Sequence, residues 1–409
     1  MYSSQSEADV TDASAKRKTR KSKTDAIPQL VDALSLCYIG SLLLRLPITV
    51  NDIYTWVASG ELLYYRAVRA LPQSMRQRLP FNYTQTLDPQ TTLKPSTLHK
   101  AVWENISAYH QSFGMLTPPI NHVLVLYRWI RGLALPLEIY TAVLRLAKML
   151  DIGFAYDTDA HKRMPQLRVI RLPEARLIGL LVVATKLLFP LDEVKRYPRK
   201  PTELSVLAMD WSVWSAAKDS YDISIKRSEP LGYEDALRVS ETDVLDMSND
   251  KLDQYMDWYA ASLGSEDLRE KGRAGKEAEF RRVMFRYFPV DRPGRQHEES
   301  WPDSDNQQSH LEGERIKTVQ RALRPLRLQE DGGSDDNGEI PLRPGSHYKR
   351  YKVASDLAGH AEHFYEEAAK VSGLSLESLV QCAFHLERRL QEWEENARKE
   401  SVRGGGNTM

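Results

Sequence analysis

Two segments of the chain are apolar around almost the whole circumference of a helix. They are residues 33–52, ALSLCYIGSLLLRLPITVND, and residues 171–192, RLPEARLIGLLVVATKLLFPLD. A helix without a polar face must be buried on every side or lie in a bilayer. Both runs are interrupted by a cation and a proline before they reach the roughly 18 apolar residues of a membrane span, at Arg45 and Pro47 and at Lys186 and Pro190. We therefore predict two central helices of all-α domains.

Helical periodicity dominates the rest of the chain. Apolar residues recur three and four positions apart, as on one buried helical face, whereas the alternation typical of strands is almost absent. Thr49 followed by Asp52 resembles a capping box, and Pro136 opens a further helix. We predict helices over residues 28–46, 49–59, 61–70, 98–112, 118–131, 136–150, 172–189, 203–218, 251–263, 277–287 and 376–393. Residues 79–95 are expected to form a surface loop, and the predicted fold class is all-α.

Charge is balanced over the whole chain but not within it. Lys plus Arg and Asp plus Glu number 56 each, so any basic surface must be local. Residues 16–23, KRKTRKSK, are too polar to form a core, and we expect a disordered tail there. Such a run also resembles a nuclear import signal. The six cations of this candidate signal are Lys16, Arg17, Lys18, Arg20, Lys21 and Lys23.

Composition predicts disorder in three segments, residues 1–25, 291–345 and 401–409. The central one contains stretches rich in Asp, Glu, Gly, Pro, Ser and Gln, which cannot bury enough apolar area to offset the entropy of ordering the chain. Residues 1–10 are polar and acidic, unlike a secretory signal, and we expect an intracellular protein.

Motifs for catalysis or metal binding are missing from the sequence. The two cysteines, Cys37 and Cys382, are far apart and lie in apolar runs, so we expect two buried thiols and no zinc site. His360 and His363 lie on one helical side with Glu366, but the spacing offers no further ligand. GxSxG, HExxH and phosphate-binding loop motifs are absent. The sequence predicts a binding protein without an enzymatic activity or a cofactor.

Three runs resemble a known family. RWIRGLALPLEIYTAVLRLAKMLDIGF at 128–154 and LPEARLIGLLVVATKLLFPLD at 172–192 resemble the second cyclin repeat of the TFIIB-like factors of RNA polymerase I. LCYIGSLLLRLPITVNDIYTWVASGELLYYRA at 36–67 resembles the first repeat. The resemblance implies two cyclin-like helical repeats. We place an N-terminally incomplete first repeat at 26–115, the second at 116–290, and a C-terminal helical segment at 346–400.

The same resemblance implies a role in transcription initiation. The expected partners are the ribosomal DNA promoter, the other core-factor subunits, TBP and RNA polymerase I, in the nucleus and nucleolus, with no membrane association. The cysteine-rich zinc ribbon with which the family begins is absent, and either truncation or divergence accounts for it. The alternative function is a cyclin-like regulatory or scaffold subunit of another complex, because one fold serves many functions.

Basic side chains around the second apolar helix are the candidates for DNA contact. Lys and Arg bind phosphates and so position a duplex without reading its sequence. The loop after that helix supplies Lys195, Arg196, Arg199 and Lys200, and the segment before it supplies Lys162, Arg163, Arg168 and Arg171. Lys186, inside the helix, is expected to extend its amine to the surface.

Overall fold

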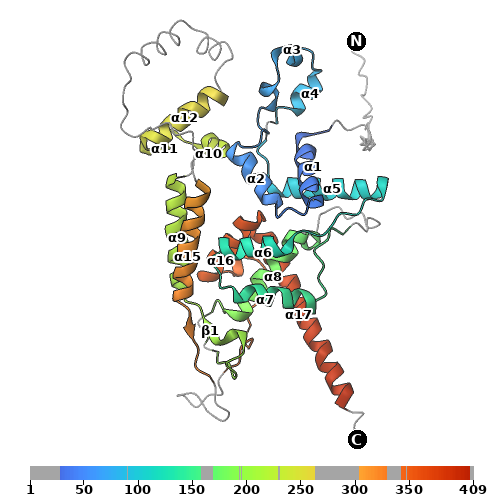
Figure 1. The fold of residues 1–409 in the computed structure, drawn as a ribbon, viewed down its shortest axis with the longest axis vertical. Coiled ribbons are helices and arrows are strands. Elements are labelled where there is room, and N and C mark those ends of the chain that lie inside the picture. The colour runs from blue at the N-terminus through green and yellow to red at the C-terminus, as the bar shows by residue number, and fades with distance from the viewer. Residues whose placement is uncertain are drawn as a thin grey trace, which may run out of the picture.

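The computed structural model describes residues 28–89, 91–157, 169–192, 194, 196–228, 231–262, 304–328, 342–346 and 348–405. Helices form nearly all of its regular structure (Figure 1). Within these residues, the strands are the two-residue β1 (Leu207–Ala208) and β2 (Arg324–Pro325), which pair antiparallel. The all-α fold class is confirmed.

The first group of helices is built on α1 (Leu30–Leu43), which packs against α5 (Pro95–Phe113) and α2 (Val50–Ser59). The predicted capping box is confirmed, since Thr49 caps α2 together with Asp52. The helix predicted over 61–70 is wrong, because Gly60 ends α2 at φ 85° and Arg66 adopts φ 53°. Short helices occupy part of this region and of the predicted loop, η2 (Ala67–Ala70), α3 (Gln73–Arg76) and α4 (Phe81–Thr86).

The second group surrounds α8 (Pro173–Leu188) (Figure 1). Helix α8 is contacted by α6 (His122–Gly132), α7 (Glu138–Met149), α16 (His360–Ser372) and α17 (Leu376–Gly405). Between residues 173 and 186, every side chain except that of Arg176 is buried. The predicted central helix is therefore confirmed. The C-terminal stripe of α17 packs on this helix within the same chain.

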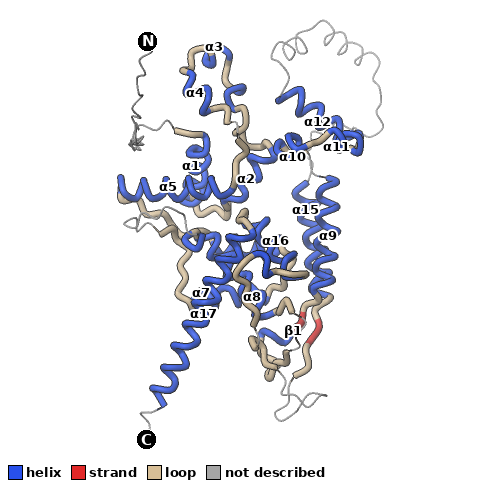
Figure 2. Tube along the Cα trace, turned by 180° about the vertical axis from the view of Figure 1, so that it is seen from behind, coloured by secondary structure: helices blue, strands red, loops and turns tan. Residues whose placement is uncertain are grey.

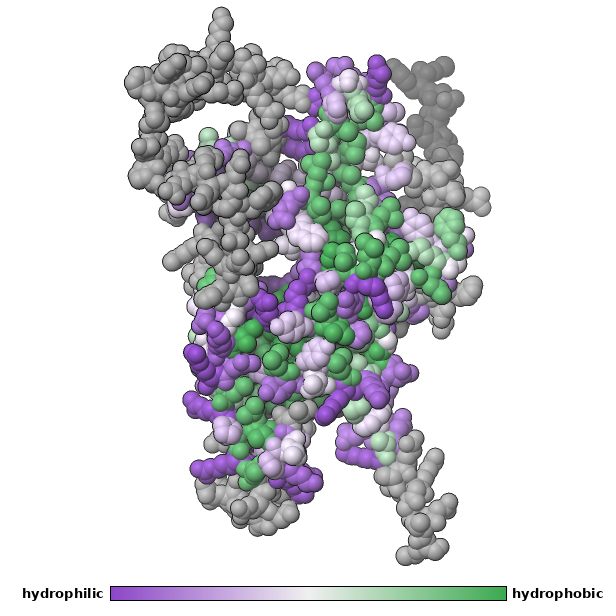
Figure 3. Space-filling model, viewed as in Figure 1, coloured by the Kyte–Doolittle hydropathy of each residue, from purple (hydrophilic) through white to green (hydrophobic). Residues whose placement is uncertain are grey.

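The first apolar helix is not enclosed in the same way. Leu36, Cys37 and Leu43 of α1 are exposed, and Leu44 after it is 72% exposed. The expectation that Cys37 is buried is thus wrong, whereas Cys382 is buried. The described helices that pack on α1 cover only one of its sides. Figure 3 shows apolar surface in the upper part of the molecule, where α1 to α5 lie.

A long helix pair lies beside these two groups. It consists of α9 (Trp211–Ser228) and α15 (Ser304–Arg321), side by side in Figures 1 and 2. The predicted helix start at residue 203 is wrong, because η4 (Leu204–Val206) and β1 come first and Asp210 accepts the Ser212 N–H at 3.1 Å. The prediction of a disordered linker over 291–345 is wrong for the residues of α15. Arg315 of this helix donates to the Arg131 carbonyl of α6 at 3.1 Å.

After α9 the described part of the chain continues in α10 (Tyr233–Arg238), α11 (Glu241–Asp246) and α12 (Asn249–Ser262). Helix α10 packs on α2, so the chain returns to the first group after α9. Glu234 supports this contact by accepting from Tyr65 at 2.7 Å and from Tyr54 at 3.2 Å. The helix predicted over 277–287 lies outside the described residues.

Two glycines test how differently the apolar helices are covered. A Cβ on Gly179 of α8 would lie 2.7 Å from Leu386 Cδ1, whereas a Cβ on Gly40 of α1 would have no neighbour within 4 Å. We expect Gly179→Ala to lower the free energy of unfolding by roughly 1 kcal/mol, because overpacking outweighs the gain in helix propensity. Gly40→Ala should raise it by about 0.5–1 kcal/mol. Urea unfolding of both variants measures the difference, and equal effects would contradict the unequal coverage.

Candidate nucleic-acid interface

One arginine of the basic loop after α8 binds groups of the same chain. Arg196 is buried, and its guanidinium donates to both carboxylate oxygens of Asp192, at 2.6 and 2.8 Å. Its Nε donates to the Ser346 carbonyl at 2.8 Å. The hydrogen bond from Arg196 lowers the pKa of Asp192. The expectation that Arg196 contacts DNA is therefore corrected, because this side chain joins two parts of the chain.

The other cations of this loop are placed differently. Arg199 and Lys200 are exposed, and Lys195 lies outside the described residues. The backbone is fixed on both sides of the pair, since the Tyr197 N–H donates to the Leu342 carbonyl at 2.9 Å and the Lys200 N–H donates to Glu203 at 3.2 Å. The structure thus presents Arg199 and Lys200 to solvent from a held backbone.

Residues 342–346 and 348–352, which we call the strap, lie against this loop. Two tyrosines and a lysine anchor the strap. Tyr348 donates to Glu387 of α17 at 2.8 Å, and the Lys186 amine donates to the Lys349 carbonyl at 3.0 Å. The same amine lies 4.6 Å from the ring centroids of both Tyr348 and Tyr351.

Lys186 itself forms a buried ion pair. Its Nζ lies 2.6 Å from Glu387 Oε1, and the two side chains are 4% and 2% exposed. Burial lowers the pKa of Lys186, and the attraction of Glu387 opposes that shift. The expectation that Lys186 reaches the surface is wrong, because the strap and α17 cover it.

Four basic residues of the strap are not among the predicted DNA-contacting residues. Arg343, Lys349, Arg350 and Lys352 are exposed. The run YKRYK at residues 348–352 is the sequence feature that indicates the last three of them. Its tyrosines can pack against the protein while the basic residues beside them face solvent. The helical segment predicted over residues 346–400 includes this run and does not reveal its role.

Of the remaining predicted basic residues, the structure describes Arg171. Arg171 ends η3 (Val169–Arg171), is partly buried, and accepts through its carbonyl from Arg176 at 3.5 Å. The residues outside the described part are Lys162, Arg163, Arg168 and the six cations of the tail, Lys16, Arg17, Lys18, Arg20, Lys21 and Lys23.

No group of three or more potential ligands for a metal ion occurs among the described residues. His363 instead shares a hydrogen bond of 2.8 Å with Ser215 and lies edge-on to Trp214. Within the same residues, no helix is both long enough and apolar enough to cross a bilayer.

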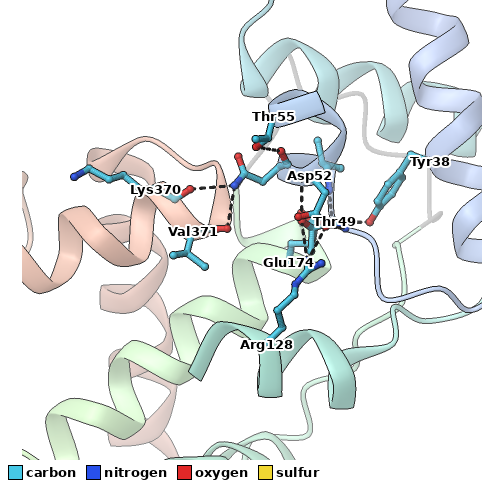
Figure 4. A network of polar contacts seen from close by, with 10 residues as sticks. Tyr38, Thr49, Asp52, Thr55, Arg128, Glu174, Lys370 and Val371 are labelled. Carbon is cyan, nitrogen blue, oxygen red and sulfur yellow. Dashed lines mark hydrogen bonds and ion pairs between the residues drawn. The ribbon is translucent and has the colours of Figure 1, made fainter. Parts of the chain in front are cut away.

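A polar cluster joins the two helix groups (Figure 4). Glu174, in the first turn of α8, is buried, and its Oε1 accepts from the Tyr38 hydroxyl at 2.6 Å and from the Val50 N–H at 3.0 Å. Tyr156 donates to the Tyr38 hydroxyl at 3.2 Å. Burial raises the pKa of Glu174 to about 7, although both hydrogen bonds favour the charged form.

The first turn of α2 is the centre of this cluster. Arg128 of α6 pairs with Asp52 at 2.7 Å, and the Asn51 amide donates to the carbonyls of Lys370 and Val371 at the end of α16, each at 3.1 Å. These contacts are visible in Figure 4. Helices α6, α8 and α16 of the second group therefore all hold the start of α2.

Two helix groups joined in sequence and built around apolar helices define the class of cyclin-like repeat proteins. Residues 1–73 match the Rrn7/TAF1B N-terminal cyclin domain, and residues 91–263 match the Rrn7/TAF1B C-terminal cyclin domain. Together these matches cover more than half of the chain, which belongs to the Rrn7/TAF1B family. The resemblance found in the sequence is confirmed.

Two curated relatives are similar along most of the chain. The RNA polymerase I-specific transcription initiation factor rrn7 of Schizosaccharomyces pombe is 20% identical over 384 residues, covering 92% of this chain and 68% of the relative. The Saccharomyces cerevisiae factor RRN7 is 21% identical over 292 residues, or 69% of this chain and 55% of the relative. A chain in the crystal structure of S. cerevisiae core factor shares the fold, with a TM-score of 0.52 and 14% identity over 90% of this chain and 84% of that one.

Proposed function

We propose that this chain is a subunit of a transcription initiation factor for RNA polymerase I. In this role it binds the ribosomal DNA core promoter within a core-factor complex and helps to recruit the polymerase. The observation that carries the proposal is the similarity to the fission yeast factor over 92% of the chain, with both cyclin domains matched in order. The expected partners are the promoter, other core-factor subunits, TBP and RNA polymerase I, in the nucleus and nucleolus.

The function is one of positioning and not of catalysis. A helical protein can hold several partners in a defined geometry if its own parts do not move against one another. The contacts of Glu174, Asp52 and Asn51 between the two helix groups provide that rigidity. The tail over residues 16–23 supplies the proposed nuclear import signal.

Chromatin immunoprecipitation of the tagged chain tests the proposed function. We expect selective occupancy of the ribosomal DNA promoter, and background occupancy at promoters of ordinary messenger RNAs and within the transcribed ribosomal DNA. An untagged strain provides the matched control. Equal signal at all promoters, or no signal anywhere, would favour the alternative, a cyclin-like regulatory or scaffold subunit of another complex.

A further inference from the structure

We propose that the loop after α8 and the strap form one surface that binds the sugar-phosphate backbone of duplex DNA. This inference rests on the proposed function, because it names the part of the chain that contacts the promoter. The cations of this surface are Arg199, Lys200, Arg343, Lys349, Arg350 and Lys352.

Contacts between the two segments make the surface continuous. The Tyr197 N–H donates to the Leu342 carbonyl, and Arg196 Nε donates to the Ser346 carbonyl. Leu342 directly precedes Arg343, and Tyr197 lies two residues before Arg199. Two basic runs about 145 residues apart in the chain are therefore adjacent in space, which adds the two cations of the loop to the four of the strap.

Carboxylates of the described residues do not pair with the side chains of these six cations, although Asp356 accepts from the Lys352 backbone N–H at 3.0 Å. Within the part of the chain that the structure describes, none of them forms an ion pair with a carboxylate. Three contact uncharged groups, since Arg350 donates to the Gln391 amide oxygen, Lys349 lies 5.4 Å from the Tyr351 ring and Lys352 lies 6.0 Å from the Phe384 ring. The Glu203 carboxylate faces the backbone N–H of Lys200.

Exposed cations elsewhere are often paired. Arg238, Lys317 and Arg398 each form an ion pair with a glutamate on their own helix. A group of unpaired like charges repels itself, and an anionic partner removes that repulsion on binding. Exposed cations without an ion pair also occur elsewhere among the described residues, for example Arg145, Lys148 and Arg321, but in the loop and strap such cations come together from two distant segments.

The anchoring of the strap fixes the positions of its charges before binding. Tyr348 and Tyr351 face the buried Lys186, while the basic residues between and after them are exposed. The cavity beneath the strap has a volume of about 20 Å³, which is room for a single water molecule. A partner therefore binds on the outside of the strap.

A duplex backbone fits these features better than a small ligand or an acidic peptide. The charges come from two segments without regular secondary structure, and the cavity described beneath the strap holds no more than one water molecule, as expected for a surface that contacts successive phosphates. Such contacts position DNA without reading its sequence. We expect the surface to bind promoter and unrelated duplexes with similar affinity.

Fluorescence anisotropy with a labelled duplex, at several salt concentrations, tests this surface on the full chain. The two variants are R199Q/K200Q/R343Q and K349Q/R350Q/K352Q, in which glutamine keeps most of each side chain. We expect each to weaken binding about tenfold or more at low salt, and to reduce the dependence of log K on log salt by up to about 0.9 per lost contact. The control R238Q/K317Q/R398Q, which removes three paired cations, should bind like the unmodified chain.

Three results would overturn the inference. Both triple variants could bind DNA like the unmodified chain, the control could lose as much affinity as they do, or the variants could lose affinity for a polyglutamate peptide and not for DNA. Circular dichroism melting checks that all chains are folded. Promoter occupancy of the unmodified chain separates the two proposals. If the chain occupies the promoter but the variants bind DNA normally, only this surface is rejected. If the variants lose DNA affinity but the unmodified chain does not occupy the promoter, only the proposed function is rejected.

Discussion

Replacing Lys186 with methionine is expected to lower the free energy of unfolding by about 3–5 kcal/mol. Methionine matches the lysine stem in length but leaves the Glu387 carboxylate, 2% exposed, without its cation. Removing one partner of a buried ion pair costs this much because an uncompensated charge remains inside the protein. The Tyr348 hydroxyl still donates to Glu387, but one neutral donor does not replace the ammonium group.

Urea unfolding at neutral pH measures this effect, and a double variant provides the control. We expect K186M/E387M to be more stable than K186M alone, because two apolar side chains leave no buried charge. Variant K186M also removes the donor to the Lys349 carbonyl, so the strap should become more susceptible to limited proteolysis. A single variant as stable as the unmodified chain would show that Glu387 takes up a proton or finds another partner at little cost.

The central helix α8 could be predicted from sequence, but the role of its lysine could not. Apolar residues on all sides of α8 required burial, and burial is observed. The sequence predicts that Lys186 reaches solvent, since this is the usual way to place a long cation on an apolar helix. Its partner Glu387 lies 201 residues away, and no local rule connects two such positions.

The first apolar helix shows the converse limit. The sequences of α1 and α8 are similarly apolar, yet Leu36 and Leu43 of α1 are exposed. Coverage depends on which other helices pack on a segment, and hydrophobicity alone does not report them. In the same way, the polar sequence of α15 indicated a linker, whereas packing against α9 and the contact of Arg315 to α6 stabilise it as a helix.

The candidate interface was predicted in part. The charge of the loop after α8 predicts a phosphate contact, and Arg199 and Lys200 are exposed as such a role requires. Charge alone does not distinguish Arg196, whose burial follows from Asp192 four residues earlier and from Ser346 far along the chain. The strap cations become part of the same surface only through tertiary hydrogen bonds, which sequence spacing does not contain.

The contact between the two helix groups should depend on pH through Glu174. Burial raises the pKa of Glu174 from its ordinary value of 4.5 to about 7. The folded chain therefore holds this proton more tightly than the unfolded chain, and the stability contributed by Glu174 is full below pH 4.5 and is lost as the pH rises to about 7. Facing charges act in opposite directions, since Asp52 raises this pKa and Arg128 lowers it, while the hydrogen bonds from Tyr38 and Val50 lower it.

Glu174→Gln should remove that pH dependence. We expect the difference in unfolding free energy between the unmodified chain and E174Q to fall by on the order of 3 kcal/mol between pH 4.5 and 7 and to stay constant above, because each pKa unit corresponds to about 1.4 kcal/mol. His99, whose pKa burial lowers to about 4, titrates in both chains and cancels. Tyr38→Phe is the matched control, since it removes a donor that favours the charged form and should move the loss of stability to higher pH. If the difference in unfolding free energy does not change with pH, Glu174 stays ionised between the two helix groups. In that case Tyr38, the Val50 N–H and the start of α8 stabilise its charge.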